Sequence, residues 1–139
     1  MSKIHSDFNL ELFFSALADR TRLRLIHLIG DDQVCVCFFV EVLQLNQPKI
    51  SRHLAYLRRA EIVSSRRDGT WVHYRLTEPK NRDAAKVLRE VRNMLAKDPE
   101  MQEDRKRLVT ICCADVLPAA VQGAPLPASL ANIRCAPQC

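Results

Sequence analysis

The chain has 139 residues, of which 47% are hydrophobic, and a formal net charge of +5. This length supports one compact core, and the hydrophobic content is ordinary for a globular protein. No apolar run approaches the roughly 20 residues that a membrane span needs, and the start, MSKIHSDFNL, contains no apolar signal segment, so we expect a cytoplasmic protein with no membrane partner.

The N-terminal half predicts four helices. Residues 7–17 carry apolar side chains at helical spacing, so one face of this first helix should pack on the core or on a partner subunit. A second helix should lie between Asp19, an expected N-cap, and Gly30. Residues 34–45 are expected to form the third helix. Asn46 should cap the fourth, which runs to about residue 60 and tolerates Pro48 in its first turn.

The next segment predicts a hairpin. Residues 62–67 and 71–76 are short β-type runs separated by Asp68-Gly69, a strong turn signal. Two short helices followed by such a hairpin indicate a mainly α fold with a small β-hairpin wing, the winged helix-turn-helix. The wing is followed by a long helix over residues 82–96, and Asp98-Pro99 indicates the start of another. We expect residues 1–112 to form this domain and residues 113–139, with four prolines after residue 113, a flexible tail.

Positive charge is concentrated in one segment. Between residues 47 and 75 seven Lys or Arg stand against two acidic residues, a net of +5, so the rest of the chain sums to zero. In a winged helix-turn-helix, this pattern is typical of a nucleic-acid footprint, with the second helix in the major groove and the wing near phosphates. The candidate DNA contacts are Gln47, Lys49, Ser51, Arg52, His53, Tyr56 and Arg58 on the helix and Arg66 and Arg67 on the wing.

Cysteines form a second candidate site. In a cytoplasmic chain, six cysteines favour metal binding or redox chemistry over structural disulfides. The C-x-C and C-C sets cannot easily bridge internally and suit a thiophilic ligand, although small buried hydrophobes are the alternative interpretation. The cysteines are Cys35, Cys37, Cys112, Cys113, Cys135 and Cys139, and the last two, in the tail, are expected to be incidental.

These motifs resemble the ArsR/SmtB family of metal-responsive repressors, and particularly its arsenic-sensing members. The matching segments cover about half the chain: LADRTRLRLI (17–26), CVC (35–37), QPKISRHLAYLRRAEIV (47–63) and RRDGTWVHYRL (66–76). The resemblance implies a homodimeric repressor, not an enzyme, whose first helix and long helix 82–96 form the dimer interface. It also implies double-stranded operator DNA as partner, and release of that DNA when trivalent arsenic or antimony binds cysteines at the third helix.

The chain departs from the family pattern at one point. Members with the CVC pattern carry a third cysteine about three positions after the second, whereas Phe38, Phe39 and Val40 follow Cys37 here. Cys112 and Cys113 are therefore the candidate donors of the third thiolate. Side chains at i and i+2 of an α-helix point roughly 200° apart, so we expect a ligand held by Cys35 and Cys37 to unwind the start of the third helix.

Three alternatives remain open. A divalent-metal repressor of the same fold would use mixed ligands on the interfacial helix, but residues 82–112 contain no histidine. A redox-responsive repressor would use the Cys112-Cys113 pair or the tail cysteines. A thiol enzyme is the weakest alternative, because neither C-x-x-C nor a nucleophile–base arrangement is evident. No organic cofactor and no protein substrate are expected.

Overall fold

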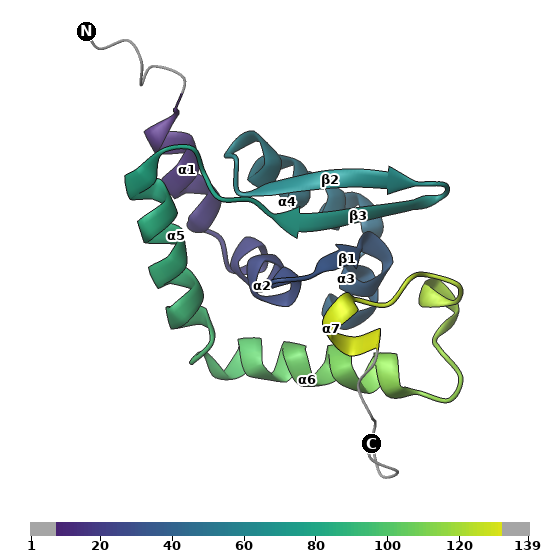
Figure 1. Ribbon diagram of the computed structural model, residues 1–139. Helices are drawn as coiled ribbons and strands as arrows, with labels where there is room; N and C mark the ends of the chain where they lie inside the picture. Colours follow the sequence, from purple (N-terminus) through teal and green to yellow (C-terminus); the bar gives the residue numbers. More distant parts are fainter. Residues whose placement is uncertain (1–7, 132–139) are drawn as a thin grey trace, which may run out of the picture.

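The computed structural model describes residues 8–131, so Asp7, Cys135 and Cys139 lie outside the described residues. Figure 1 shows a helical body from which one β-hairpin extends, with α1 and α5 at the end opposite the hairpin tip. This is the predicted mainly helical winged fold. Its elements are α1 (Leu10–Leu17), α2 (Arg20–Ile29), β1 (Gln33–Cys35), α3 (Val36–Leu43), α4 (Gln47–Arg59), β2 (Val63–Asp68), β3 (Trp71–Leu76), α5 (Arg82–Leu95), α6 (Pro99–Cys113), η2 (Ala119–Val121) and α7 (Ala128–Ala131).

Local capping explains where the helices begin. The side chain of Asp19 accepts a hydrogen bond from the Arg22 main-chain N–H at 3.0 Å, and Asn46 accepts one from the Lys49 N–H at 2.9 Å. Asp98 caps α6 in the same way. Each cap satisfies an N–H that has no partner within its helix, and all three caps confirm the sequence prediction.

A three-stranded antiparallel sheet has the order β1-β3-β2. The hairpin tip is Gly69-Thr70, one residue later than predicted, because Asp68 still pairs with Trp71 in the ladder. Gly69 has φ +62°, which a residue without Cβ adopts without strain. The short strand β1 was not predicted; the expectation of a helix from residue 34 is wrong for its first two residues, which pair with β3.

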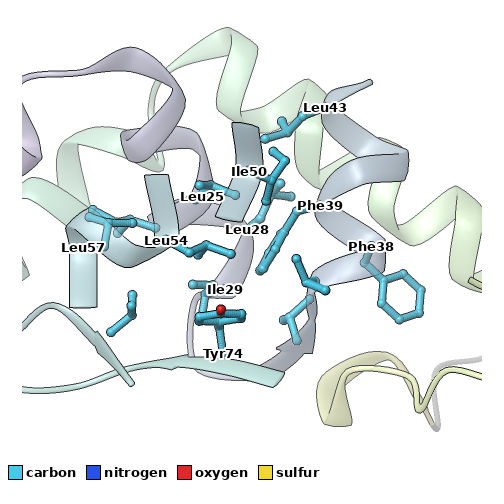
Figure 2. Packing of buried hydrophobic residues seen from close by; sticks show 14 of the residues in the cluster. Leu25, Leu28, Ile29, Phe38, Phe39, Leu43, Ile50, Leu54, Leu57 and Tyr74 are labelled. Carbon is cyan, nitrogen blue, oxygen red and sulfur yellow. The ribbon is translucent and has the colours of Figure 1, made fainter. Parts of the chain in front are cut away.

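The core lies between α2, α3, α4 and one face of the sheet. Figure 2 shows Phe39 of α3 pointing in among side chains of α2 and α4, while Tyr74 of β3 closes the core from the sheet. Phe38 points to the other side of α3, toward the C-terminal segment. Burial of this apolar surface is the main force that holds α4 in place. The α4 residues that it buries are Ile50, Leu54 and Leu57.

Helix α6 docks beneath α2 through a buried ion pair. Arg24 donates from Nε and Nη2 to the two carboxylate oxygens of Asp104, both at 2.8 Å. The Asp104 side chain is 1% exposed and that of Arg24 17%. A bidentate guanidinium–carboxylate pair is among the stronger polar contacts.

Residues 117–131 pack against the body, which corrects the expectation of a flexible tail for this stretch. Val121 and Leu130 are buried in the core cluster. The Ser129 main-chain N–H donates to Asp32 at 3.0 Å, which joins the segment to the loop before β1. No helix between residues 8 and 131 combines the length and apolar character that crossing a membrane requires.

Candidate nucleic-acid interface and thiol site

The outer face of α4 is polar and basic. Gln47, Lys49 and Arg52 are exposed in its first half, and Ser51 is half-buried. The opposite face is buried in the core, so these side chains are presented to solvent on a fixed helix. Lysine and arginine can neutralise phosphates, and arginine can also bond a guanine edge bidentately.

Two other predicted contacts on α4 are turned toward the protein. His53 Nδ1 lies 3.2 Å from Arg22 Nη1, and the Arg22 guanidinium lies 4.1 Å from the centroid of the Tyr56 ring. Both His53 and Tyr56 are half-buried. Burial lowers the pKa of His53, with Asp19 opposing and neighbouring cations reinforcing this shift.

The hairpin wing carries exposed arginines. Arg66 donates from Nε to Gln33 Oε1 at 2.7 Å, which ties β2 across the sheet to β1. Arg67 lies at the tip, where its Nη1 donates to the Gly69 carbonyl at 3.3 Å. Arg58, in the last turn of α4, donates to Ser65 Oγ at 3.1 Å and so links that helix to the wing.

One exposed cation of α4 was missing from the sequence-predicted set. Arg59 ends α4, is exposed, and its guanidinium lies 4.9 Å from the Tyr56 ring centroid, on the same aromatic side chain as Arg22. The only signal in the sequence was its place in the Arg58-Arg59 pair. Both arginines of the pair are exposed in the structure.

The structure brings Cys35 and Cys37 together. Their Sγ atoms are 3.0 Å apart, with the Cys37 thiol donating to Cys35. Cys35 ends β1 and is the N-cap of α3, with extended backbone angles of φ −68° and ψ 142°. The two residues are therefore not two positions of one helix. The expectation that a shared ligand must unwind α3 is wrong, since the sulfurs are already adjacent.

Hydrogen bonding favours the thiolate form of Cys35. The bond from Cys37 lowers the pKa of Cys35 to about 6, against the opposing effect of burial, and main-chain N–H groups of Cys37, Val72 and Val36 act in the same direction. The same hydrogen bond, with burial, raises the pKa of Cys37. At neutral pH the pair therefore holds one thiolate and one thiol, and the thiolate is the form that binds soft metals.

The thiol pair lies between the wing and the helix that supports α4. Cys35 pairs directly with His73 of β3, and α3 packs against α4. His73 is 4% exposed, and its Nε2 is the buried side-chain nitrogen or oxygen that has no hydrogen-bond partner among residues 8–131. Burial lowers the His73 pKa, which favours a neutral ring beside the thiols.

Cys112 and Cys113 end α6 and are both half-buried. Burial raises the pKa of Cys112 to about 11, so its thiol is protonated at neutral pH. Within the described part of the chain no three His, Cys, Asp or Glu side chains are grouped so that they could hold a metal ion. The four predicted cysteine donors therefore do not form a preassembled site; two of them do lie together.

Comparisons with known proteins bear on both the candidate nucleic-acid interface and the thiol pair. A family model described as "bacterial regulatory protein, arsR family" matches residues 19–65. The chain is 53% identical over 66 residues to the arsenic resistance transcriptional regulator ArsR1 of Pseudomonas putida, which covers 47% of this chain and 52% of that protein. It is 45% identical over 78 residues to the arsenical resistance operon repressor of Escherichia coli, covering 55% and 67%.

A solved structure is similar as well. The crystal structure of the AntR antimony-specific transcriptional repressor matches with a TM-score of 0.51 and 28% identity, covering 68% of this chain and 80% of that one. The chain spans about half the length of the first of the two curated relatives and about two thirds of the second. Both relatives are named as regulators of transcription, and neither is named as an enzyme.

Proposed function

This chain belongs to the ArsR family of bacterial regulatory proteins, and we propose that it is an arsenic- or antimony-responsive repressor. It binds double-stranded operator DNA as a homodimer and releases it when the trivalent metalloid binds Cys35 and Cys37. The observation that carries the proposal is the 3.0 Å separation of these two sulfurs where β1 meets α3.

The DNA is read by α4. Gln47, Lys49, Ser51 and Arg52 enter the major groove, where a helix fits and where base edges are distinguishable. Arg58, Arg66 and Arg67 bind phosphates on either side of that groove. They are exposed, and their protein partners are neutral oxygens, so phosphate binding has no internal ion pair to break.

The homodimer forms through α1 and α5. Leu10 and Phe14, one turn apart on α1, are 55% and 48% exposed, and Met94 of α5 is 68% exposed. Large apolar side chains gathered on two helices favour a partner surface of the same kind, as a twofold dimer provides. A second copy of the chain would cover them.

The metalloid exchanges hydroxide for thiolate. Arsenite reaches the site as arsenous acid, and each As–S bond formed with Cys35 or Cys37 replaces one As–OH bond. Each departing hydroxide leaves as water; the Cys37 thiol supplies one proton and solvent the other. The lowered pKa of Cys35 favours the first of these exchanges.

Release of DNA follows from the position of the site. Cys35 is paired with β3 of the wing, and Cys37 lies in the first turn of α3, which packs against α4. A ligand bound to both sulfurs is therefore connected to both DNA-binding elements. It shifts the protein away from the DNA-bound arrangement only by its greater affinity for the released one. Of the two cysteines that end α6, Cys112 carries a free thiol, and it supplies the third thiolate if the end of α6 moves toward the pair.

A parallel titration tests this function. A labelled duplex that wild-type protein selects from a randomised pool is held in complex and titrated with arsenite, antimonite, Cd(II), Zn(II) and hydrogen peroxide, with fluorescence anisotropy as readout. The proposal requires release by arsenite or antimonite at lower concentrations than by the other three. Release by Cd(II) or Zn(II) alone would indicate a divalent-metal repressor, and release by peroxide alone a thiol-redox repressor.

A further inference from the structure

We propose that Arg22 is a positioning residue that ties α4 to α1 and thereby sets how the DNA-reading helix is presented. This inference rests on the proposed function, since it assigns a role within operator binding. It concerns a side chain of α2 that lies outside the sequence-predicted set of DNA contacts, and it gives His53 and Tyr56 a different role from direct base reading.

Two nitrogens of the Arg22 guanidinium cap the C-terminal end of α1. Its Nη2 donates to the Ser15 carbonyl and its Nε to the Ala16 carbonyl, both at 2.9 Å. The last turn of α1 contains no basic residue of its own. Carbonyls at a helix C-terminus lack partners within the helix and carry partial negative charge, so a cation from the next helix satisfies both needs.

The other side of the guanidinium holds α4. Its Nη1 lies 3.2 Å from His53 Nδ1, and its central carbon lies 4.1 Å from the Tyr56 ring centroid. Residues 53 and 56 are three apart and share one face of the helix. The Arg22 side chain is 12% exposed, so these contacts are made where water competes little.

The hydrogen bond also selects one form of His53. A guanidinium has donors only, so the nitrogen that it contacts must be the acceptor of the ring. The ring proton is therefore on Nε2, which leaves an N–H donor for a phosphate oxygen. Without Arg22, neither the position of the His53 ring nor its tautomer would be fixed.

The link matters because of what each helix does. The exposed apolar side chains of α1 form part of the proposed dimer interface, so a fixed α1–α4 relation fixes the spacing of the two reading helices. Without it, every exposed cation on α4 and the wing is retained. Electrostatic affinity for DNA should therefore persist while discrimination between sequences is lost.

The test uses the full chain with Arg22→Gln and Arg22→Lys. Arg20→Gln is the matched control, since Arg20 is the neighbouring arginine of α2 and its partners are Asp98, the N-cap of α6, and Glu100, in the first turn of that helix. The probes are the selected duplex, the same duplex with one base pair inserted between half-sites, and a shuffled duplex. Affinities are measured across a salt series, and folding is checked by circular dichroism.

Both Arg22 variants should lose about tenfold in affinity for the selected duplex, the scale of one mismatched base pair. Their affinity for the shuffled duplex and their salt slope should match wild type, as should all three affinities of the control. Wild-type discrimination by the lysine variant would show that charge alone suffices and would overturn the inference. A salt slope lower by about 0.9 would overturn it too, because it would make Arg22 a phosphate contact.

Tyr56 provides a second pair of variants if the Arg22 variants fold poorly. Tyr56→Phe keeps the ring face that Arg22 contacts and should keep wild-type discrimination, whereas Tyr56→Leu should lose it. Loss of discrimination in the phenylalanine variant would make the hydroxyl a direct DNA contact and overturn the inference. If wild-type protein binds selected and shuffled duplexes equally, the proposed function fails. If wild-type protein discriminates between them and the variants discriminate equally well, only the role of Arg22 fails.

Discussion

Replacing Arg24 with leucine should destabilise the protein more than replacing Asp104 with leucine, and replacing both should be less harmful than either. Asp104 is 1% exposed and accepts both of its short hydrogen bonds from Arg24. Without Arg24, the nearest remaining cation is Arg107, whose Nη1 lies 3.9 Å away. A buried charge that loses its partner costs about 3–5 kcal/mol.

The reverse change leaves a better-solvated charge. Arg24 is 17% exposed and keeps a second carboxylate, Glu100, at 3.5 Å. We therefore expect Asp104→Leu to cost about 1–3 kcal/mol. The double variant should lie within about 1 kcal/mol of wild type, because an apolar pair of similar volume replaces two desolvated charges.

Urea unfolding monitored by circular dichroism measures all four free energies of unfolding at neutral pH, and the double-mutant cycle gives the coupling energy. None of the candidate DNA contacts lies on α6 or at Arg24, so operator affinity below the unfolding transition should be unchanged in every variant. Single variants with equal effects, or effects that simply add in the double variant, would show that the unequal burial of Arg24 and Asp104 does not set these costs.

Three further predictions concern the DNA surface, pH and the third sulfur. Arg66→Ala and Arg67→Ala should each lower the slope of log affinity against log salt by about 0.9; an unchanged slope in a salt series would remove that wing arginine from the phosphate contacts. Burial lowers the His53 pKa from its ordinary value of 6.5, so the stability contributed by the neutral ring is fully present above pH 6.5 and is lost as the pH falls through the lowered pKa. The melting temperature of wild-type protein should accordingly fall more between about pH 7 and 5 than that of His53→Gln, and equal losses would contradict this. Replacing Cys112 with serine should reduce arsenite affinity and remove the third sulfur from an X-ray absorption fit while sparing the response to methylarsenite, which needs two thiolates; three sulfurs retained in the fit would place the third donor elsewhere.

Much of the fold could be predicted because its signals are local. Asp19, Asn46 and Asp98 each cap the helix that follows them, and Gly69 permits the tight hairpin turn. Capping and turn formation depend on a few neighbouring residues, so the sequence pattern is sufficient. The periodicity of α4 likewise indicated which of its faces is buried.

What could not be predicted depends on contacts between distant segments. The strand β1 has three residues, and only its pairing with β3 distinguishes it from the start of a helix. That pairing places Cys35 before α3 and brings its sulfur to Cys37, whereas helical spacing predicted that the two side chains would point apart. Val121 and Leu130 pack a proline-containing segment that composition alone suggested to be loose. The role proposed for Arg22 is equally invisible in the sequence, where it is one of three arginines in α2.

We propose above that Cys35 and Cys37 together form the metalloid site. The experiment measures the arsenite concentration that releases half of the bound operator duplex from wild-type protein and from the Cys35→Ser, Cys37→Ser and Cys112→Ser variants. Serine offers a hard oxygen in place of the soft thiolate, so both variants of the pair should bind the duplex as wild type does and fail to release it. Cys112→Ser keeps the pair, so it should still release the duplex, but at a higher arsenite concentration than wild type. Release from both Cys35→Ser and Cys37→Ser at the wild-type arsenite concentration would contradict the account.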